Sequence, residues 1–333
     1  MANFTIGPLT ICVAPAAIMK CAIGLNAWQF RRAYRGQPAV EAFCAHVCEY
    51  IMRRPDEIGL ELLQADVSAQ IARLQRAYTP RPPGVDEFSR LVRTILRSDA
   101  QRSAIVRSAE RFTAWFEQFC ASPYLRLAQR ALERLALAGI TLTRDGRFRN
   151  AYAALTPPRQ LSTGQYVPWL AAVAVQMDTI CDGPAPAIEF IETLLHEQIH
   201  AIIHERMRDN GEHYHRLPWF NELSAIALSQ YAVAAAAADL RPALGFHELR
   251  GALRTSRAQQ RWGDLAGVVM RETGDPLVFW RAWQAIFARG SHTRRNYAHR
   301  AVLPPILQAA GWAVSFPYHY GDQSVDCRDE RVP

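Results

Sequence analysis

The chain has 333 residues, half of them apolar, so it is long enough to bury a sizeable core in one large domain or two smaller ones. The formal net charge is +7, and the seven cysteines are odd in number and irregularly spaced, which argues against a secreted disulfide framework. No apolar run approaches the ~20 residues of a membrane span, and no basic segment opens a signal peptide. We therefore expect a cytoplasmic protein, or one exported without a cleaved signal peptide.

Positive charge is concentrated in the first half of the chain. Residues 1–150 hold 21 Lys and Arg against 13 Asp and Glu, whereas residues 151–333 hold 17 against 18. Two interpretations follow: arginine-rich helix faces in contact with solvent, or an anionic partner for the N-terminal half.

Lysine is almost absent, since Lys20 is the only lysine among 38 basic residues. A GC-rich coding sequence is one explanation. Selection against ubiquitination, which modifies lysine, is the other. The second explanation fits a bacterial effector or toxin that is delivered into a host cell.

The N-terminal region starts β-prone over residues 3–14, with a break at Gly7-Pro8, and turns helical from about Ala39 to Gly139. Apolar residues recur at helical spacing in two runs, Val40-Phe43-Val47-Ile51 and Leu60-Leu63-Val67-Ile71-Leu74. Asp86 can cap the next helix, whose inner face holds Phe88, Leu91 and Ile95, and two more helices fit Ala104–Cys120 and Pro123–Leu137. Cys44 and Cys48, four residues apart around His46, predict buried thiols or, alternatively, a second metal site.

The character of the sequence changes near residue 140. Residues 140–143 alternate before a hairpin-type turn at Asp145-Gly146, and residues 166–180 suit either strand or helix. Helices are expected over Pro186–Arg208, over Pro218–Ala238 and within 242–310. The sequence thus predicts an α+β, predominantly helical fold. Residues 1–139 would form a basic helical region for recruitment, delivery or regulation, and residues 140–333 a catalytic domain with a small sheet.

The strongest chemical signal is His196-Glu197-Gln198-Ile199-His200, an H-E-x-x-H motif within a proline-free apolar run. Two histidines four residues apart lie on one face of a helix, where both rings can bind one Zn²⁺ ion. Glu197 then lies beside the metal and can take a proton from a bound water. This motif resembles the signature of zincin metallopeptidases.

A catalytic zinc needs a third protein ligand, and Glu222 is the first candidate. It lies 22 residues after His200 within Trp219-Phe220-Asn221-Glu222-Leu223-Ser224-Ala225. The combination resembles the gluzincins, the thermolysin-like superfamily, in which a glutamate on a returning helix completes the site. Leu223 stands where that pattern usually has glycine.

His215 is the alternative third ligand, 15 residues after His200. The order of His196, His200, His215 and Trp219 resembles the SprT-like proteases, although Arg216 replaces the usual glycine and no zinc-ribbon cysteines follow. His213 and His204 are weaker candidates. The metzincin pattern is excluded, because it requires histidine where this chain has Arg206.

The gluzincin resemblance implies a zinc-dependent endopeptidase with His196, His200 and Glu222 as metal ligands and Glu197 as general base. His292 and Tyr297 are the candidates for stabilising the oxyanion, and Ala171–Val175 is the candidate edge strand for substrate. Two alternatives remain open: an SprT-like protease that acts on DNA-bound proteins, and a zincin-fold binding module without catalysis. Partners would be a protein or peptide substrate and, for the basic half, an anion.

Overall fold

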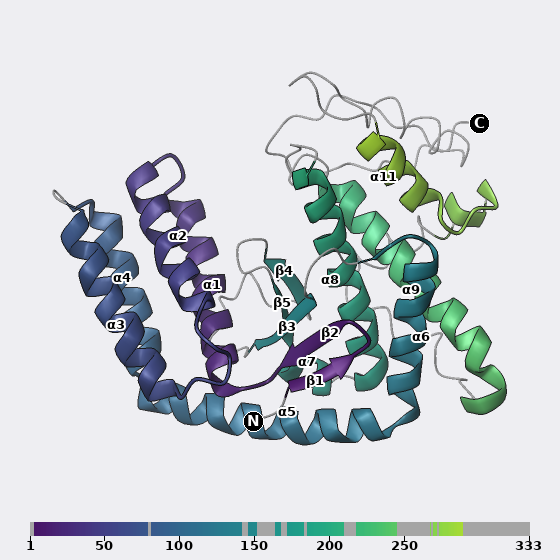
Figure 1. Cartoon of the computed structure of the whole chain (residues 1–333), viewed down its shortest axis with the longest axis horizontal. Coiled ribbons are helices and arrows are strands. Elements are labelled where there is room, and N and C mark those ends of the chain that lie inside the picture. Colours follow the sequence, from purple (N-terminus) through teal and green to yellow (C-terminus); the bar gives the residue numbers. More distant parts are fainter. Residues whose placement is uncertain are drawn as a thin grey trace. The chain divides into compact units, whose positions relative to one another are not determined.

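The computed structural model describes residues 3–78, 81–141, 146–151, 164–167, 172–182, 185–209, 218–244, 267, 269–271 and 273–288 (Figure 1). The chain divides into two compact units, Met1–Leu125 with Asp145–Thr193, and Arg126–Arg144 with Leu194–Pro333. These boundaries differ from the predicted division after residue 139, because a single unit holds the N-terminal strands and residues 145–193. The predicted division of functions between the two halves stays a prediction.

The first unit contains a five-stranded sheet in the order β1-β2-β3-β5-β4. Its strands are β1 (Asn3–Ile6), β2 (Leu9–Cys12), β3 (Gly146–Ala151), β4 (Gly164–Val167) and β5 (Ala172–Gln176). Strands β1 and β2 pair antiparallel across the break predicted at Gly7-Pro8, where Gly7 adopts a φ of 57°. Strand β3 runs parallel to both β2 and β5, and β4 is antiparallel to β5. A small sheet within a mostly helical chain agrees with the predicted α+β class.

Two expectations about this sheet have different outcomes. The first is that Arg147-Phe148 would pair back across a turn at Asp145-Gly146: residues 142–145 lie outside the described residues, and the partners of β3 are β2 and β5. Residues 172–176 do form a strand, but β5 is an interior strand and β4 lies at that edge of the sheet. A substrate backbone therefore cannot pair with the predicted strand.

Five long helices also belong to the first unit: α1 (Pro15–Ala33), α2 (Pro38–Met52), α3 (Leu60–Ala77), α4 (Pro83–Arg97) and α5 (Asp99–Ala121). The short helix α7 (Met177–Cys181) follows β5 in the same unit. The predicted apolar runs of α2 and α3 lie in its main core cluster, and only Leu60 and Leu74 are partly buried. Asp86 does not cap α4, since the helix begins at Pro83. Ser98 caps α5 by accepting a hydrogen bond from the Gln101 amide.

Helix α1 has no counterpart in the predicted elements. Its residues from Ala16 to Leu25 are almost all buried, so no polar stripe marks a helical period. Lys20 is among them, with an exposed fraction of 0%. Its ammonium group lies 2.7 Å from Asp56 Oδ1 and donates to the Arg54 carbonyl oxygen as well. Burial of the single lysine is thus compensated by a carboxylate and a carbonyl.

The second unit contains most of α6 (Pro123–Leu137), the later part of α8 (Pro186–Asp209), and α9 (Pro218–Leu244) and α11 (Val278–Ala288). The predicted bounds of α6 are confirmed, as are the starts of α8 and α9. Arg130 and Arg134 of α6 both pair with Asp239 of α9. The Trp283 indole of α11 donates to Ser224 Oγ of α9 at 2.9 Å. These contacts fix α9 at both ends within the unit.

Residues Phe220–Leu240 of α9 form, within the described part of the chain, one helix long and apolar enough to cross a membrane by length and composition. Glu222 near its start and Asp239 near its end keep the uncharged run between them shorter than the ~20 residues of a membrane span. Since 61% of the segment is buried inside the protein, a core helix explains it equally well. The expectation of no membrane span stays a prediction.

Candidate metal centre

Helix α8 places His196 and His200 one turn apart on one face. Apolar residues surround the motif on the other faces of the helix and are fully buried, among them Leu194, Leu195 and Ile199. The two imidazole rings lie nearly perpendicular, at 84°, and their Nε2 atoms are 2.9 Å apart. The predicted helix and the predicted pairing of the two rings are therefore present.

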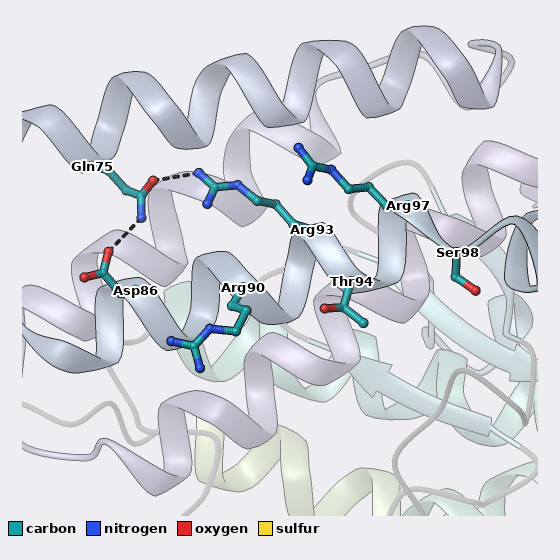
Figure 2. A pocket seen from close by; sticks show the side chains of 7 residues that line it. All are labelled: Gln75, Asp86, Arg90, Arg93, Thr94, Arg97 and Ser98. Atoms are coloured by element: carbon teal, nitrogen blue, oxygen red, sulfur yellow. Dashed lines mark hydrogen bonds between the residues drawn. The ribbon is translucent and has the colours of Figure 1, made fainter.

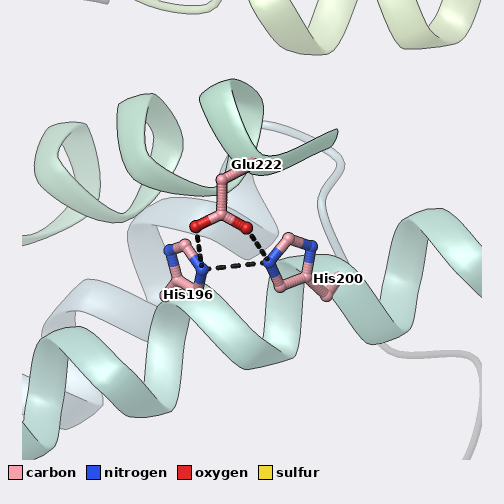
Figure 3. Close-up of side chains that lie close together, drawn as sticks. All are labelled: His196, His200 and Glu222. Carbon is pink, nitrogen blue, oxygen red and sulfur yellow. Dashed lines mark hydrogen bonds and ion pairs between the residues drawn. The ribbon is translucent and has the colours of Figure 1, made fainter. Parts of the chain in front are cut away.

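Glu222 reaches the same point from the first turns of α9 (Figure 3). Its Oε1 atom lies 3.3 Å from His196 Nε2, and its Oε2 atom lies 3.2 Å from His200 Nε2. Ser224, two residues further along α9, accepts the hydrogen bond from Trp283, so the turn that carries Glu222 is held by a buried contact. The structure thus brings together the three side chains that the sequence nominated from two separate helices.

The distances between the three side chains suit a metal ion. Ligand atoms about 2.0–2.1 Å from a tetrahedral zinc are themselves separated by about 3.3 Å. The observed separations of 2.9, 3.2 and 3.3 Å are close to that value. Two imidazole nitrogens and one carboxylate are also the donor set of a catalytic zinc site with an open fourth position. The residues present therefore fit the ion that the sequence predicts.

Solvent reaches one side of this cluster. The side chain of Glu222 is 36% exposed and that of His196 is 15% exposed, whereas that of His200 is 9% exposed. An ion held by these groups would have a position left for water or a substrate carbonyl.

The electrostatics of the cluster favour a positive charge at its centre. Burial alone would lower the pKa of His200, but the hydrogen bond to Glu222 and its negative charge raise that pKa to about 9. Burial would raise the pKa of Glu222, yet His196 and His200 hold it well below its ordinary range. A divalent cation supplies the same charge in the same place, so the carboxylate is already in the ionised form that binds metal.

Glu197, the predicted general base, follows His196 directly and is 6% exposed. Its carboxylate is one of the negative charges that raise the pKa of His200, which places it within electrostatic reach of the cluster. Asn221, which precedes Glu222, is 3% exposed and its side chain also contributes to the raised pKa of His200. Asn221 is therefore a buried neighbour of the cluster and not a solvent-facing side chain.

Two carboxylates earlier in α8 are buried and not surface charges. Glu189 and Glu192 are 7% and 6% exposed. Burial, together with the neighbouring Glu189, raises the pKa of Glu192 to about 8. The helical pattern of the sequence does not reveal that these two carboxylates are buried.

Several nominated residues do not join the cluster. His204 lies one turn after His200 but is not part of the metal-type group, which among the described residues consists of His196, His200 and Glu222. His213, His215, His292 and Tyr297 lie outside the described residues. Cys44 and Cys48 are buried, with pKa values raised to about 12 chiefly by burial, whereas His46 is exposed. Buried thiols are thus the correct interpretation of that pair.

Comparison with protein-family models, with curated proteins and with solved structures finds no match. The chemistry of the cluster is consequently argued from its own residues.

Proposed function

We propose that this chain is a zinc-dependent endopeptidase of the gluzincin type. The observation that carries the proposal is the meeting of His196 Nε2, His200 Nε2 and the Glu222 carboxylate within 3.3 Å of one another. Glu197 beside them supplies the base that hydrolysis requires.

Each residue has a defined task in this mechanism. His196, His200 and Glu222 hold the ion, which when bound acts as a Lewis acid toward water and the scissile carbonyl. Glu197 accepts the proton of the attacking water and then donates it to the amine that leaves. His292 and Tyr297 remain the proposed donors to the oxyanion.

The third ligand separates the proposed function from its closest alternative. A gluzincin site needs Glu222, whereas an SprT-like site needs His215. The approach of Glu222 to both histidines supports the first, and the same approach would serve a binding module that holds zinc without catalysis.

Metal analysis combined with a peptide-cleavage assay tests the proposal. We expect about one zinc per chain in the wild type and in His215→Ala, a loss of zinc in Glu222→Ala, and cleavage within a peptide library only by the zinc-bound proteins. Absence of zinc from the wild type contradicts the metal site itself. Zinc lost from His215→Ala but kept by Glu222→Ala would indicate the SprT-like alternative, and tightly bound zinc without any cleavage would indicate a binding module.

A further inference from the structure

A hollow of about 730 Å³ lies in the first unit, away from the histidine cluster in the sequence (Figure 2). Three arginines of α4 line it, namely Arg90, Arg93 and Arg97. The hydroxyl groups of Thr94 and Ser98 line it as well. Three cations and two hydroxyls around one hollow are the groups that bind oxyanions.

The spacing of the arginines keeps their charges out of the core. Arg90, Arg93 and Arg97 follow one another at intervals of three and four residues, so they share one side of α4. The opposite side holds Val85, Phe88 and Val92, which are fully buried. All three charges therefore lie on the outer side of one helix.

Several arginines of this unit are taken up by acidic partners: Arg53 pairs with Glu49, Arg102 with Asp99, and Arg111 with Asp182. Within the described ranges, no ion pair joins Arg90, Arg93 or Arg97 to a carboxylate. Their positive charges are therefore available to an anionic ligand in the hollow.

One of the three arginines is already held in place. Arg93 donates to Gln75 Oε1 at 2.7 Å, and Gln75 Nε2 donates to Asp86 Oδ1 at 2.9 Å, as the dashed lines in Figure 2 show. Arg81 Nη1 lies 3.3 Å from the same oxygen of Asp86. Asp86, the acidic residue that lines the hollow, therefore has a positive partner of its own. Figure 2 also shows Arg93 and Arg97 extending toward α3, while Arg90 extends from the other edge of α4.

We propose that this hollow binds a small ligand that carries two or more phosphate groups. Seven residues of helix separate the Cα atoms of Arg90 and Arg97 by about 10 Å, at about 1.5 Å per residue. Since the side chain of Arg90 also extends away from that of Arg97 in Figure 2, a single phosphate does not meet both guanidinium groups as they lie, whereas a chain of phosphates can. The bidentate geometry of arginine suits phosphate oxygens, and the hydroxyls of Thr94 and Ser98 add neutral donors.

Calorimetric titration of the full chain with inorganic triphosphate tests this site. The variant Arg90→Gln/Arg97→Gln removes two exposed charges, and the matched control Arg35→Gln/Arg107→Gln removes two exposed arginines elsewhere in the unit. We expect the wild type to bind triphosphate more tightly than inorganic phosphate at equal ionic strength. The first variant should weaken triphosphate binding at least about tenfold, and the control less than about twofold.

Three results would overturn the proposal. The first is equal affinity of the wild type for triphosphate and for inorganic phosphate at matched ionic strength. The second is equal weakening in both double variants, which would mean attraction by net charge alone. The third is tight binding of a single-stranded oligonucleotide together with no binding of triphosphate, which would make the surface a nucleic-acid contact. Thermal unfolding of both variants at the wild-type temperature establishes that the substitutions leave the fold intact.

Discussion

His196, His200 and Glu222 show which part of a site a local pattern can predict. The four-residue interval in α8 determines that the two rings share a face, because helix geometry leaves no other arrangement. The approach of Glu222 to the two rings was not determined in this way. It depends on the turn of α9 that meets α8, and contacts such as the hydrogen bond from Trp283 to Ser224 set that turn. Packing between distant segments has no periodic signature in the sequence.

Glu197 is the residue on which the proposed chemistry depends most directly. Replacing Glu197 by Gln should reduce the turnover number by about 10²–10⁴-fold, because the amide cannot accept the proton of the attacking water. Zinc content should stay at the wild-type level, since Glu197 is not among the three ligands. Assays of cleavage and zinc content, with the exposed Glu110→Gln as the control, measure both effects. Wild-type turnover in Glu197→Gln contradicts the mechanism.

Glu192 predicts a pH dependence of stability. Its pKa is about 8 in the folded protein against 4.5 for the ordinary side chain. Between these two pH values the unfolded chain has released the proton that the folded chain still holds, so the free energy of unfolding falls as pH rises.

The variant Glu192→Gln should remove this dependence, because the amide stays neutral in both states. We expect similar stability to the wild type near pH 4.5 and an advantage on the order of 4 kcal/mol near pH 8. Denaturant unfolding at both pH values measures the difference, with Glu110→Gln as the exposed control. Equal slopes of stability against pH in wild type and Glu192→Gln would contradict the assignment.

Helices with one apolar face were predicted well from the sequence, and elements without such a face were not. The runs through Phe43 and Val67 marked α2 and α3 because their opposite faces are polar. Helix α1 is buried on nearly all sides, so its pattern carries no period. The turn residues Asp145-Gly146 suggested a hairpin, but they precede a strand whose partners, β2 and β5, come from other parts of the chain.

The ion pair between Lys20 and Asp56 joins α1 to the segment after α2, and its contribution to stability can be tested. Replacing Asp56 by Ala should lower the free energy of unfolding by about 3–5 kcal/mol, because it leaves a buried ammonium group without its counter-charge. Adding Lys20→Met should recover at least half of the loss, since it removes that charge. Denaturant unfolding of the single and double variants is the measurement, and a double variant no more stable than Asp56→Ala would contradict this explanation.

The two units of the molecule are built from different segments of the chain than the sequence predicted. Residues 3–12 pair with residues 146–151, which requires more than 130 residues of chain between neighbouring parallel strands. Local propensity can predict each strand, but it cannot show which strands pair, such as β3 with β2. The chain passes from one unit to the other three times before α9 begins.

Metal binding should be visible in the stability of the whole chain. An ion that binds only the folded state stabilises it by about 4 kcal/mol at a free concentration 1,000 times the dissociation constant. We expect chelation to lower the Tm of the wild type by several degrees and added zinc to restore it. The variant His196→Ala/His200→Ala should show neither change in differential scanning calorimetry. A Tm of the wild type that is independent of chelator and zinc would contradict the site.

The burial of Lys20 gives this protein an unusual chemical surface. Because the single lysine of the chain is fully enclosed, the folded first unit offers no side-chain amine to acylating reagents. Modification of Lys20 then requires that unit to open, so mass spectrometry of one peptide measures the rate of opening without any introduced probe. A free lysine derivative added to the same reaction supplies the internal standard for the reagent.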